Sequence, residues 1–230
     1  MIFLDKLKNR ISADGYIFGS YLIFSRILRI FRSRIYEFLL NAKNLDIGTG
    51  CYLKGVRYIR FGNDISIFRG IWLEAVSYHN GYIFSPKIKI GNNVCFSNNV
   101  HVSCINSVTI DDNVLIGSNV HISDHNHGSY IGEECSSPEE NPSMRRLISA
   151  GTVHIQERVW IGDNVTIIGP VLIGVGAVIG SNSVVRGNID AGTVAVGAPA
   201  RMIKRYNCSS QQWEKCLNDP IVTGRINLNR

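Results

Sequence analysis

The chain has 230 residues, of which 45% are hydrophobic and only 18% charged, so it has enough apolar material for one domain with short appendages. Its net charge of +6 is compatible with an anionic partner, whether nucleic acid, a membrane surface or a cofactor. Nucleic acid is disfavoured, because no nucleic-acid-binding motif and no interleaved aromatic and basic residues are present. The six cysteines form no CxxC pair and no metal-binding spacing, which indicates free thiols in a reducing cytoplasm.

Residues 1–43 contain no repeat and are predicted to form an N-terminal helical segment. Apolar residues recur there at helical spacing: Phe24, Leu28, Phe31, Ile35 and Phe38. Arginines occupy the other side of the same helix: Arg26, Arg29, Arg32 and Arg34. They disfavour a transmembrane span, which needs about 20 apolar residues, and a signal peptide is disfavoured because the basic residues follow the apolar run. Two compatible roles stay open: a cap on the next domain, or contact of residues 21–40 with anionic lipid at the inner face of a membrane.

Residues 44–206 are organised by a period of six. An aliphatic residue occupies every sixth position of the clearest run: Ile155, Ile161, Ile167, Ile173, Ile179 and Val185. A small or aliphatic residue follows each of them by four positions: Val159, Val165, Val171, Ala177, Ser183 and Ile189. This period fits neither a helix nor a simple strand, and it predicts a solenoid in which three hexads make one triangular coil. Gly, Asn and Asp turn the corners, where positive φ suits them. The predicted fold is an all-β, left-handed parallel β-helix.

The same ladder appears earlier in the chain, from Ile47 to Leu73 and from Ile90 to Ile122. It is interrupted between Glu74 and Lys87, and again by the loop 123–153. Loops of the second length are uncommon inside a compact repeat and are usually functional. Residues 207–230 form a C-terminal tail, in which a short helix is expected from Ser210 to Leu217.

Three motifs resemble one known family when they are taken together. They are the loop Asp124-His125-Asn126-His127-Gly128, the run Val159-Trp160-Ile161-Gly162 and the ending Gly197-Ala198-Pro199-Ala200. The chain resembles, over about residues 45–206, the hexapeptide-repeat O-acetyltransferases that modify sugars of cell-surface polysaccharides. The resemblance implies acetyl-CoA as co-substrate and no metal. It also implies a homotrimer with active sites between subunits, and a sugar or lipid-linked oligosaccharide as acceptor.

Acetyl transfer to a hydroxyl needs a general base, and histidine suits that role because its ordinary pKa is near 6.5. The family's catalytic histidine aligns with His127, but a slip of one corner would replace it by His125. Asp124 either orients the imidazole or caps a turn. His101, His121 and His154 are interpreted as packing or subunit-contact residues. Neither a serine nor a cysteine of the loop has a base beside it, which favours direct transfer to the acceptor.

The resemblance also assigns the residues that contact the coenzyme. Trp160 matches the family tryptophan that packs beside the pantetheine arm or at the subunit interface. Ser181 and Arg186 match positions that border the coenzyme, although the usual Thr-Lys pair is here Arg186-Gly187. Pro199 belongs to the closing motif, and Arg201 and Lys204 after it are candidates for phosphate contact.

The family's acceptor-binding residues match this sequence less well than its coenzyme-binding residues do. The family's sugar-contacting Asn and Asp fall on Ser97 and Ile105. Neighbouring amides are the substitutes: Asn98, Asn99, Asn106 and, in the histidine loop, Asn126.

Three other functions stay open. A zinc carbonic anhydrase would need three histidines bridging subunits. A non-catalytic scaffold would leave the histidine loop without a role. An N-acetyltransferase acting on an amino sugar is the rival within acyl transfer.

Overall fold

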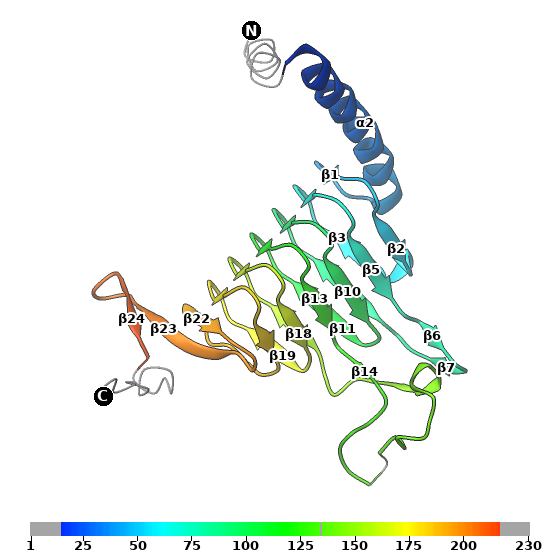
Figure 1. The fold of residues 1–230 in the computed structure, drawn as a ribbon, viewed down its shortest axis with the longest axis vertical. Coiled ribbons are helices and arrows are strands. Elements are labelled where there is room, and N and C mark those ends of the chain that lie inside the picture. The colour runs from blue at the N-terminus through cyan, green and yellow to red at the C-terminus, as the bar shows by residue number, and fades with distance from the viewer. Residues whose placement is uncertain (1–14, 134, 217–230) are drawn as a thin grey trace, which may run out of the picture.

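The computed structural model describes residues 15–133 and 135–216, which form a triangular solenoid with one long helix at its first coil (Figure 1). Face A contains β1 (Asp46–Ile47), β4 (Ser66–Ile67), β9 (Cys95–Phe96), β12 (Leu115–Ile116), β17 (Trp160–Ile161), β20 (Val178–Ile179) and β22 (Thr193–Val196). Face B contains β2 (Tyr52–Lys54), β5 (Trp72–Ala75), β10 (His101–Cys104), β13 (His121–Ser123), β18 (Thr166–Ile168) and β21 (Val184–Val185). Face C contains β3 (Ile59–Phe61), β8 (Lys87–Ile90), β11 (Ser107–Ile110), β16 (Val153–Ile155) and β19 (Val171–Ile173). The strands of each face pair in parallel, and the predicted left-handed parallel β-helix is confirmed.

The interior of the solenoid is the predicted ladder. All six residues of the run from Ile155 to Val185 are fully buried, and the residues four positions after them are at most 5% exposed. Equivalent residues stack in register from coil to coil, as in the column Ile122, Ile167 and Val185 of face B. Burying each aliphatic side chain contributes about 1.5–3 kcal/mol, so the ladder supplies most of the driving force for the fold.

Asparagines turn the corners between faces A and B. Asn99, Asn119, Asn164 and Asn182 all have positive φ, between 55° and 60°. Their side-chain amides form a hydrogen-bonded column, with Nδ2–Oδ1 distances of 3.0–3.2 Å. Asn99, a predicted acceptor residue, therefore lies in a column that stabilises the corner.

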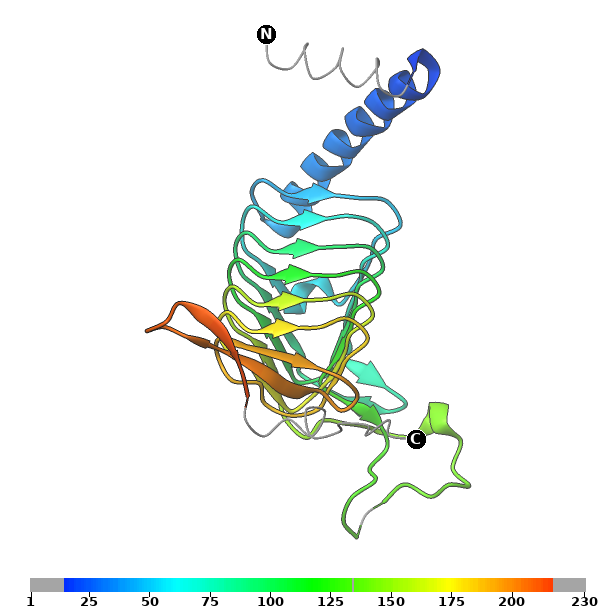
Figure 2. The same cartoon turned by 60° about the vertical axis from the view of Figure 1, so that its left-hand side comes forward.

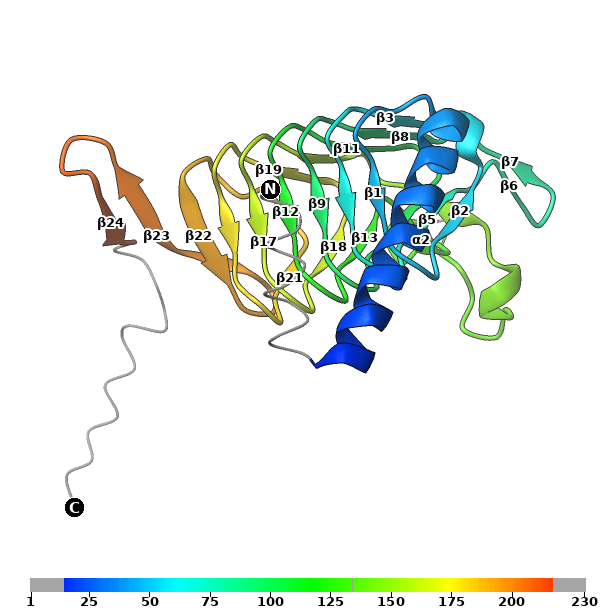
Figure 3. The same ribbon diagram turned by 90° about the horizontal axis from the view of Figure 1, so that it is seen from above.

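The helix α2 (Tyr16–Leu40) lies on the first coil and extends beyond the solenoid (Figures 2 and 3). The side of the helix that carries Arg29, Arg32 and Ser33 makes the contact, together with Tyr36 and Leu40. The N–H and C=O of Ile47 both lack a neighbouring strand, because β1 is the outermost strand of face A. Ser33 Oγ accepts from the Ile47 N–H at 2.9 Å, and Arg32 donates to the Ile47 carbonyl from Nε and Nη2 at 3.1 and 2.9 Å. Arg29 forms an ion pair with Asp46 and donates to the Ile67 carbonyl at 3.2 Å.

The five residues of the predicted apolar stripe of α2 point away from the solenoid, whereas Tyr36 and Leu40 pack against its core. Exposed fractions are 59% for Phe24, 68% for Phe31 and 87% for Phe38, and Leu28 and Ile35 are also exposed. Two of the four arginines, Arg29 and Arg32, thus bind the first coil. The apolar stripe formed by these five residues has no partner among the described residues. The N-terminal part of the segment 1–43, residues 1–14, lies outside the described residues.

Two short hairpins interrupt the solenoid. One consists of β6 (Tyr78–His79) and β7 (Tyr82–Ile83), and the other of β14 (Asn126–His127) and β15 (Leu147–Ile148). Two 3₁₀ turns complete the element order, η1 (Val56–Tyr58) and η2 (Pro142–Met144).

The helix expected from Ser210 to Leu217 is wrong. β23 (Arg201–Asn207) folds back antiparallel on β22, and β24 (Gln212–Lys215) pairs with β23. Asn207 Oδ1 accepts from the N–H groups of Ser209 and Ser210 and closes the turn between them. Trp213 packs edge-on against Tyr206, with ring centroids 5.4 Å apart, and this cross-strand pair favours a strand over a helix. β23 crosses the predicted boundary at residue 206, and residues 217–230 lie outside the described residues.

Candidate active site

The hairpin β6–β7 and the loop 123–153 project together from the corner between faces B and C (Figures 1 and 2). They hold each other in place. Asn80 Nδ2 donates to the Ser143 carbonyl at 2.7 Å, and the Arg146 guanidinium lies 4.9 Å from the centroid of the Tyr82 ring. A small buried cluster of Val76, Ile105 and Leu147, with Phe84 against it, fills the space at their base. The two interruptions of the repeat therefore make one wall beside face B.

Asp124 is the first residue after β13, and its side chain is fully buried. Its carboxylate accepts from the backbone N–H groups of Ile105 and Asn106 at 3.0 and 2.8 Å, from Cys104 Sγ at 3.3 Å and from His125 Nδ1 at 2.8 Å. Burial raises the pKa of Asp124, but these hydrogen bonds, that of His125 foremost, outweigh it and hold the pKa below its ordinary value. Asp124 is therefore a fixed carboxylate and not a surface cap.

His125 is oriented by this carboxylate. A carboxylate only accepts hydrogen bonds, so His125 Nδ1 donates to Asp124, and in the neutral ring the lone pair is on Nε2. The His125 side chain is 7% exposed. In its neutral form the imidazole is thus held as the Nδ1–H tautomer, which leaves Nε2 able to accept a proton.

His127 is in a different environment. It lies in β14, its side chain is exposed, and its ring packs edge-on against His79 with centroids 5.6 Å apart. Its carbonyl accepts from the Tyr130 hydroxyl at 2.7 Å. No carboxylate of the described residues contacts its ring, so Asp124 is brought together with His125 and not with His127.

His125 and His127 line the same depression, of about 370 Å³, on face B. Its floor is a row of residues that each precede a ladder residue, namely Trp72, His101 and His121. Trp72 stacks on His101 with centroids 4.4 Å apart, and His101 lies 4.9 Å from His121. Glu74 and Ser103 lie in the next row of the same face. Trp72 and Glu74 were not singled out from the sequence, although their places beside Leu73 in the hexad ladder put them in line with the histidines.

Burial keeps the histidines of the floor neutral. It is the main cause that lowers the pKa of His121 to about 4, with smaller contributions from His101 and His125. Burial also lowers the pKa of His101, and Glu74 opposes the shift in part. His125 thus lies beside the neutral aromatic and imidazole rings of this floor.

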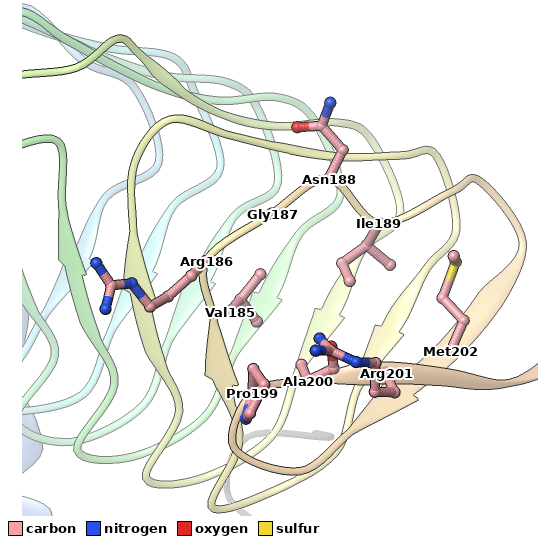
Figure 4. Close-up of a pocket in the computed structure, with 9 residues that line it drawn as sticks. All are labelled: Val185, Arg186, Gly187, Asn188, Ile189, Pro199, Ala200, Arg201 and Met202. Carbon is pink, nitrogen blue, oxygen red and sulfur yellow. The ribbon is translucent and has the colours of Figure 1, made fainter. Parts of the chain in front are cut away.

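The predicted coenzyme residues lie in three places. Arg186, Pro199 and Arg201 line a hollow of about 360 Å³ at the last coil, where two separate segments of the chain, 185–189 and 199–202, face each other (Figure 4). Trp160 is 52% exposed on face A, in register with Leu115 and Val178. Lys204 extends the same face on β23, beside Val194. Ser181 lies at the corner next to Gly162, where its Oγ accepts from the Asp163 N–H at 3.2 Å.

Of the predicted acceptor residues, only Asn126 lines the histidine depression. The backbone N–H of Asn106 donates to Asp124, and Ile105 is buried beneath the wall. Ser97 and Asn98 lie with Asn99 at the corner between faces A and B. Within residues 15–133 and 135–216, no three His, Cys, Asp or Glu side chains are grouped so as to hold a metal ion.

Comparison with known proteins identifies the family. A sequence model described as bacterial transferase hexapeptide (six repeats) matches residues 152–187. WbbJ of Escherichia coli K12, which is named as a lipopolysaccharide biosynthesis O-acetyl transferase, is 43% identical over 166 residues. The alignment covers 72% of this chain and 81% of WbbJ. The chain belongs to the hexapeptide-repeat acetyltransferases. The predicted family and the prediction of an acyltransferase are therefore confirmed.

Solved structures share the fold of this acetyltransferase. A variant of AntD, an N-acyltransferase from Bacillus cereus in complex with dTDP and coenzyme A, has a TM-score of 0.59 at 22% identity, and the match covers 74% of this chain and 84% of that one. The hexapeptide-repeat acetyltransferase VCA0836 from Vibrio cholerae O1 biovar eltor, in complex with acetyl-CoA, has a TM-score of 0.51 at 22% identity, with 76% and 78% covered. At these identities the likeness establishes the common β-helix.

Proposed function

We propose that this acetyltransferase transfers the acetyl group of acetyl-CoA directly to a sugar hydroxyl, with His125 as general base. The observation that carries the proposal is the 2.8 Å hydrogen bond from His125 Nδ1 to the buried Asp124 carboxylate, beside an open depression. The name of WbbJ supports a hydroxyl acceptor in a surface polysaccharide precursor.

The proposed reaction has two proton transfers. The acceptor hydroxyl gives its proton to His125 Nε2 while its oxygen attacks the thioester carbonyl carbon. The tetrahedral intermediate then collapses, the carbon–sulfur bond breaks, and the departing thiolate of coenzyme A takes the proton back from the imidazolium. Asp124 stays ionised throughout and stabilises the imidazolium.

A covalent acetyl-enzyme is not part of the proposal. Cys104 touches Asp124, but burial, followed by the charge of Asp124, raises the pKa of this thiol far above its usual range and keeps it neutral. Ser123 Oγ donates to the His125 carbonyl at 2.9 Å, so its proton is directed away from the imidazole. Neither Cys104 nor Ser123 is therefore arranged to attack the thioester, which supports direct transfer.

Paired substitutions at the two loop histidines test the assignment. His125→Ala should lower kcat by at least about 10²-fold and leave the binding of acetyl-CoA nearly unchanged, because only the base is lost. His127→Ala is the matched control and should keep most of the activity. A screen of free sugars, nucleotide sugars and lipid-linked oligosaccharides, with release of coenzyme A as readout, supplies the acceptor. A dead His127→Ala beside an active His125→Ala would contradict the proposal.

Transfer to an amino sugar is the second candidate function. It is favoured by AntD, an N-acyltransferase whose variants were also crystallised with dTDP-4-amino-4,6-dideoxyglucose, although the likeness is one of fold. The same acceptor screen separates the two candidates when each sugar is offered beside its amino analogue. Acetylation of amines alone would replace the hydroxyl proposal.

We further propose that the enzyme works as a homotrimer at the cytoplasmic face of the inner membrane. In one chain the predicted coenzyme residue Trp160 lies on face A and the histidines lie on face B, and a neighbouring copy would bring the two faces together. The exposed apolar stripe of α2 is the surface that would meet the lipid. Within residues 15–133 and 135–216, no helix is both long enough and apolar enough to cross a bilayer.

A further inference from the structure

A second polar cleft lies between α2 and the corner of faces A and B. It measures about 350 Å³ and is separate from the histidine depression. Four arginines line it: Arg26, Arg29, Arg32 and Arg69. The only acidic side chain bonded to any of them is Asp46, which pairs with Arg29, so the described residues leave the cleft with a formal charge of +3.

Two of these arginines are held rigidly. Arg32 makes both of its hydrogen bonds to the Ile47 carbonyl, and Arg29 is held by Asp46, by the Ile67 carbonyl and by the Phe68 ring, whose centroid is 5.7 Å from its guanidinium carbon. A guanidinium that is already oriented loses little conformational entropy when it binds an anion. Arg29 and Arg32, which hold α2 on the first coil, therefore also line the cleft with oriented guanidinium groups.

The other two arginines have no ion-pair partner among the described residues. Arg26 and Arg69 are both exposed, and they enter the cleft from α2 and from the corner after Ile67. Neither of them is needed to close the first coil, since Arg29, Arg32 and Ser33 do that. A cationic cleft with two unpaired arginines is suited to a multiply charged anion with several oxygen acceptors.

We propose that this cleft binds the diphosphate group of a diphosphate ester. A diphosphate diester has two negative charges, which equals the charge of the two unpaired arginines, Arg26 and Arg69. It also has enough oxygens to accept hydrogen bonds from several guanidinium groups at once. Tyr21 lines the cleft and is itself 61% exposed at the edge of the apolar stripe of α2. A lipid-linked diphosphate would thus place its head in the cleft and its chain along the stripe.

The cleft is also close to the proposed catalytic face. Arg69 precedes Trp72 by three residues across the corner at Gly70, so their Cα atoms are at most about 10 Å apart, and Trp72 lines the histidine depression. A sugar attached to the diphosphate would extend along face B toward His125. The proposal for the cleft does not require acetyl transfer, because binding can be measured without turnover.

Titration calorimetry with inorganic pyrophosphate tests the cleft on the full-length protein at low ionic strength. Replacing both unpaired arginines, Arg26→Ala with Arg69→Ala, should weaken pyrophosphate binding at least tenfold, and added salt should weaken wild-type binding. The matched control is Arg57→Ala with Arg60→Ala, which removes the same charge from two exposed arginines of the first coil outside the cleft. This control should bind within twofold of wild type.

Further probes distinguish the source of the diphosphate. UDP-glucose represents a nucleotide sugar, and neutral vesicles containing geranylgeranyl diphosphate represent a lipid carrier, with phosphatidylglycerol vesicles as the reference for charge alone. The source is the probe whose binding depends on Arg26 and Arg69. Three results would overturn the proposal. They are an equal loss of pyrophosphate affinity in both double variants, binding of orthophosphate as tight as that of pyrophosphate, and no binding of any diphosphate. A tenfold rise of the KM for acetyl-CoA in the cleft variant would also overturn it, because the cleft would then be the coenzyme site.

Discussion

Asp124 contributes to the proposed chemistry without touching the acceptor. Its carboxylate keeps the proton of His125 on Nδ1, so an amide in its place would offer a donor where the imidazole needs an acceptor. We expect Asp124→Asn to lower kcat by about 10²–10⁴-fold and to leave the KM for acetyl-CoA nearly unchanged. Steady-state kinetics on both substrates check this.

Asp124 also accepts from the backbone of Ile105 and Asn106, so a thermal melt of Asp124→Asn is needed as a control. A variant that melts as wild type does and turns over at the wild-type rate would remove Asp124 from the mechanism. Restored activity at higher pH would instead indicate that only the acid–base balance of His125 had changed.

His121 gives the protein a predictable sensitivity to acid. Its folded-state pKa of about 4 lies below the ordinary value of 6.5, so between these values the unfolded chain binds a proton that the folded chain does not. The contribution of neutral His121 to the free energy of unfolding should therefore be fully present above pH 6.5. It should be lost as the pH drops toward 4, by an amount on the order of 1–2 kcal/mol for a half-buried side chain.

Urea unfolding midpoints between pH 7 and pH 4 measure this loss. His121→Gln should flatten the decline. Thr166→Val, the neighbour of His121 in the same row of face B, carries no titratable group and should leave the decline as it is in wild type. An unchanged pH dependence in His121→Gln would show that other groups cause the loss.

The roles of the two loop histidines could not be decided from the sequence. His125 and His127 are two residues apart, and the hexad period stops at Ile122, so no repeat specifies which of them turns inward. The choice depends on Asp124, whose burial follows from backbone donors at Ile105 and Asn106 one coil earlier. Hydrogen bonds between coils leave no trace in a pattern of residue types.

At the scale of elements, the coils of the solenoid were predictable from the sequence. The packing of α2 at the N-terminal end and the strand β24 at the C-terminal end were not. Every buried ladder position repeats the same surroundings, so Ile161 or Ile179 reveals its place through the period alone. The helix α2 is different, because it satisfies the backbone groups of Ile47, and every residue type has those groups. Its amphipathic pattern showed two faces but not that the polar face turns inward. The strand β24 was missed for a similar reason, since the turn at Asn207 and the pair Tyr206–Trp213 outweigh the local helical pattern.

The exposed stripe of α2 predicts binding to anionic lipid vesicles. Phe31→Glu with Phe38→Glu should reduce co-sedimentation with phosphatidylglycerol vesicles at least about tenfold, because burying each phenylalanine contributes about 1.5–3 kcal/mol. Both side chains are well exposed, so the solenoid should fold as before. Ile83→Glu with Ile131→Glu is the matched control, since these residues are 84% and 89% exposed on the wall beside face B.

Failure of the wild-type protein to sediment with such vesicles at low salt would refute lipid contact. A change in the number of subunits in Phe31→Glu with Phe38→Glu, measured by light scattering, would instead show that the stripe packs against other copies of the chain.

At the scale of the whole molecule, the trimer proposal makes a quantitative prediction about mixed subunits. His125→Ala lacks the proposed base on face B, and Trp160→Ala should bind acetyl-CoA weakly through face A. If each site joins face B of one subunit to face A of the next, random 1:1 mixing leaves about a quarter of the sites with both native side chains. Co-expressed variants, assayed at low acetyl-CoA, should recover about that share of wild-type activity.

Separately purified variants mixed without exchange of subunits are the control and should stay nearly inactive. Recovery of no activity on co-expression would mean that each chain builds its site alone. Trp213→Ala, which removes a similarly exposed tryptophan from β24, should not affect acetyl-CoA binding.

The hydrogen bonds of Ser33 and Arg32 to the backbone of Ile47 have a consequence for solubility. A β-helix is a stack of identical layers, and its terminal layer is a template on which the last coil of another molecule could continue the stack. Such head-to-tail contact does not close on itself, so it would produce fibres. Because the outward N–H and C=O groups of Ile47 are already bonded to α2, no strand can add to the edge of face A there. The residues that hold α2 in place thus also keep each solenoid a particle of finite length.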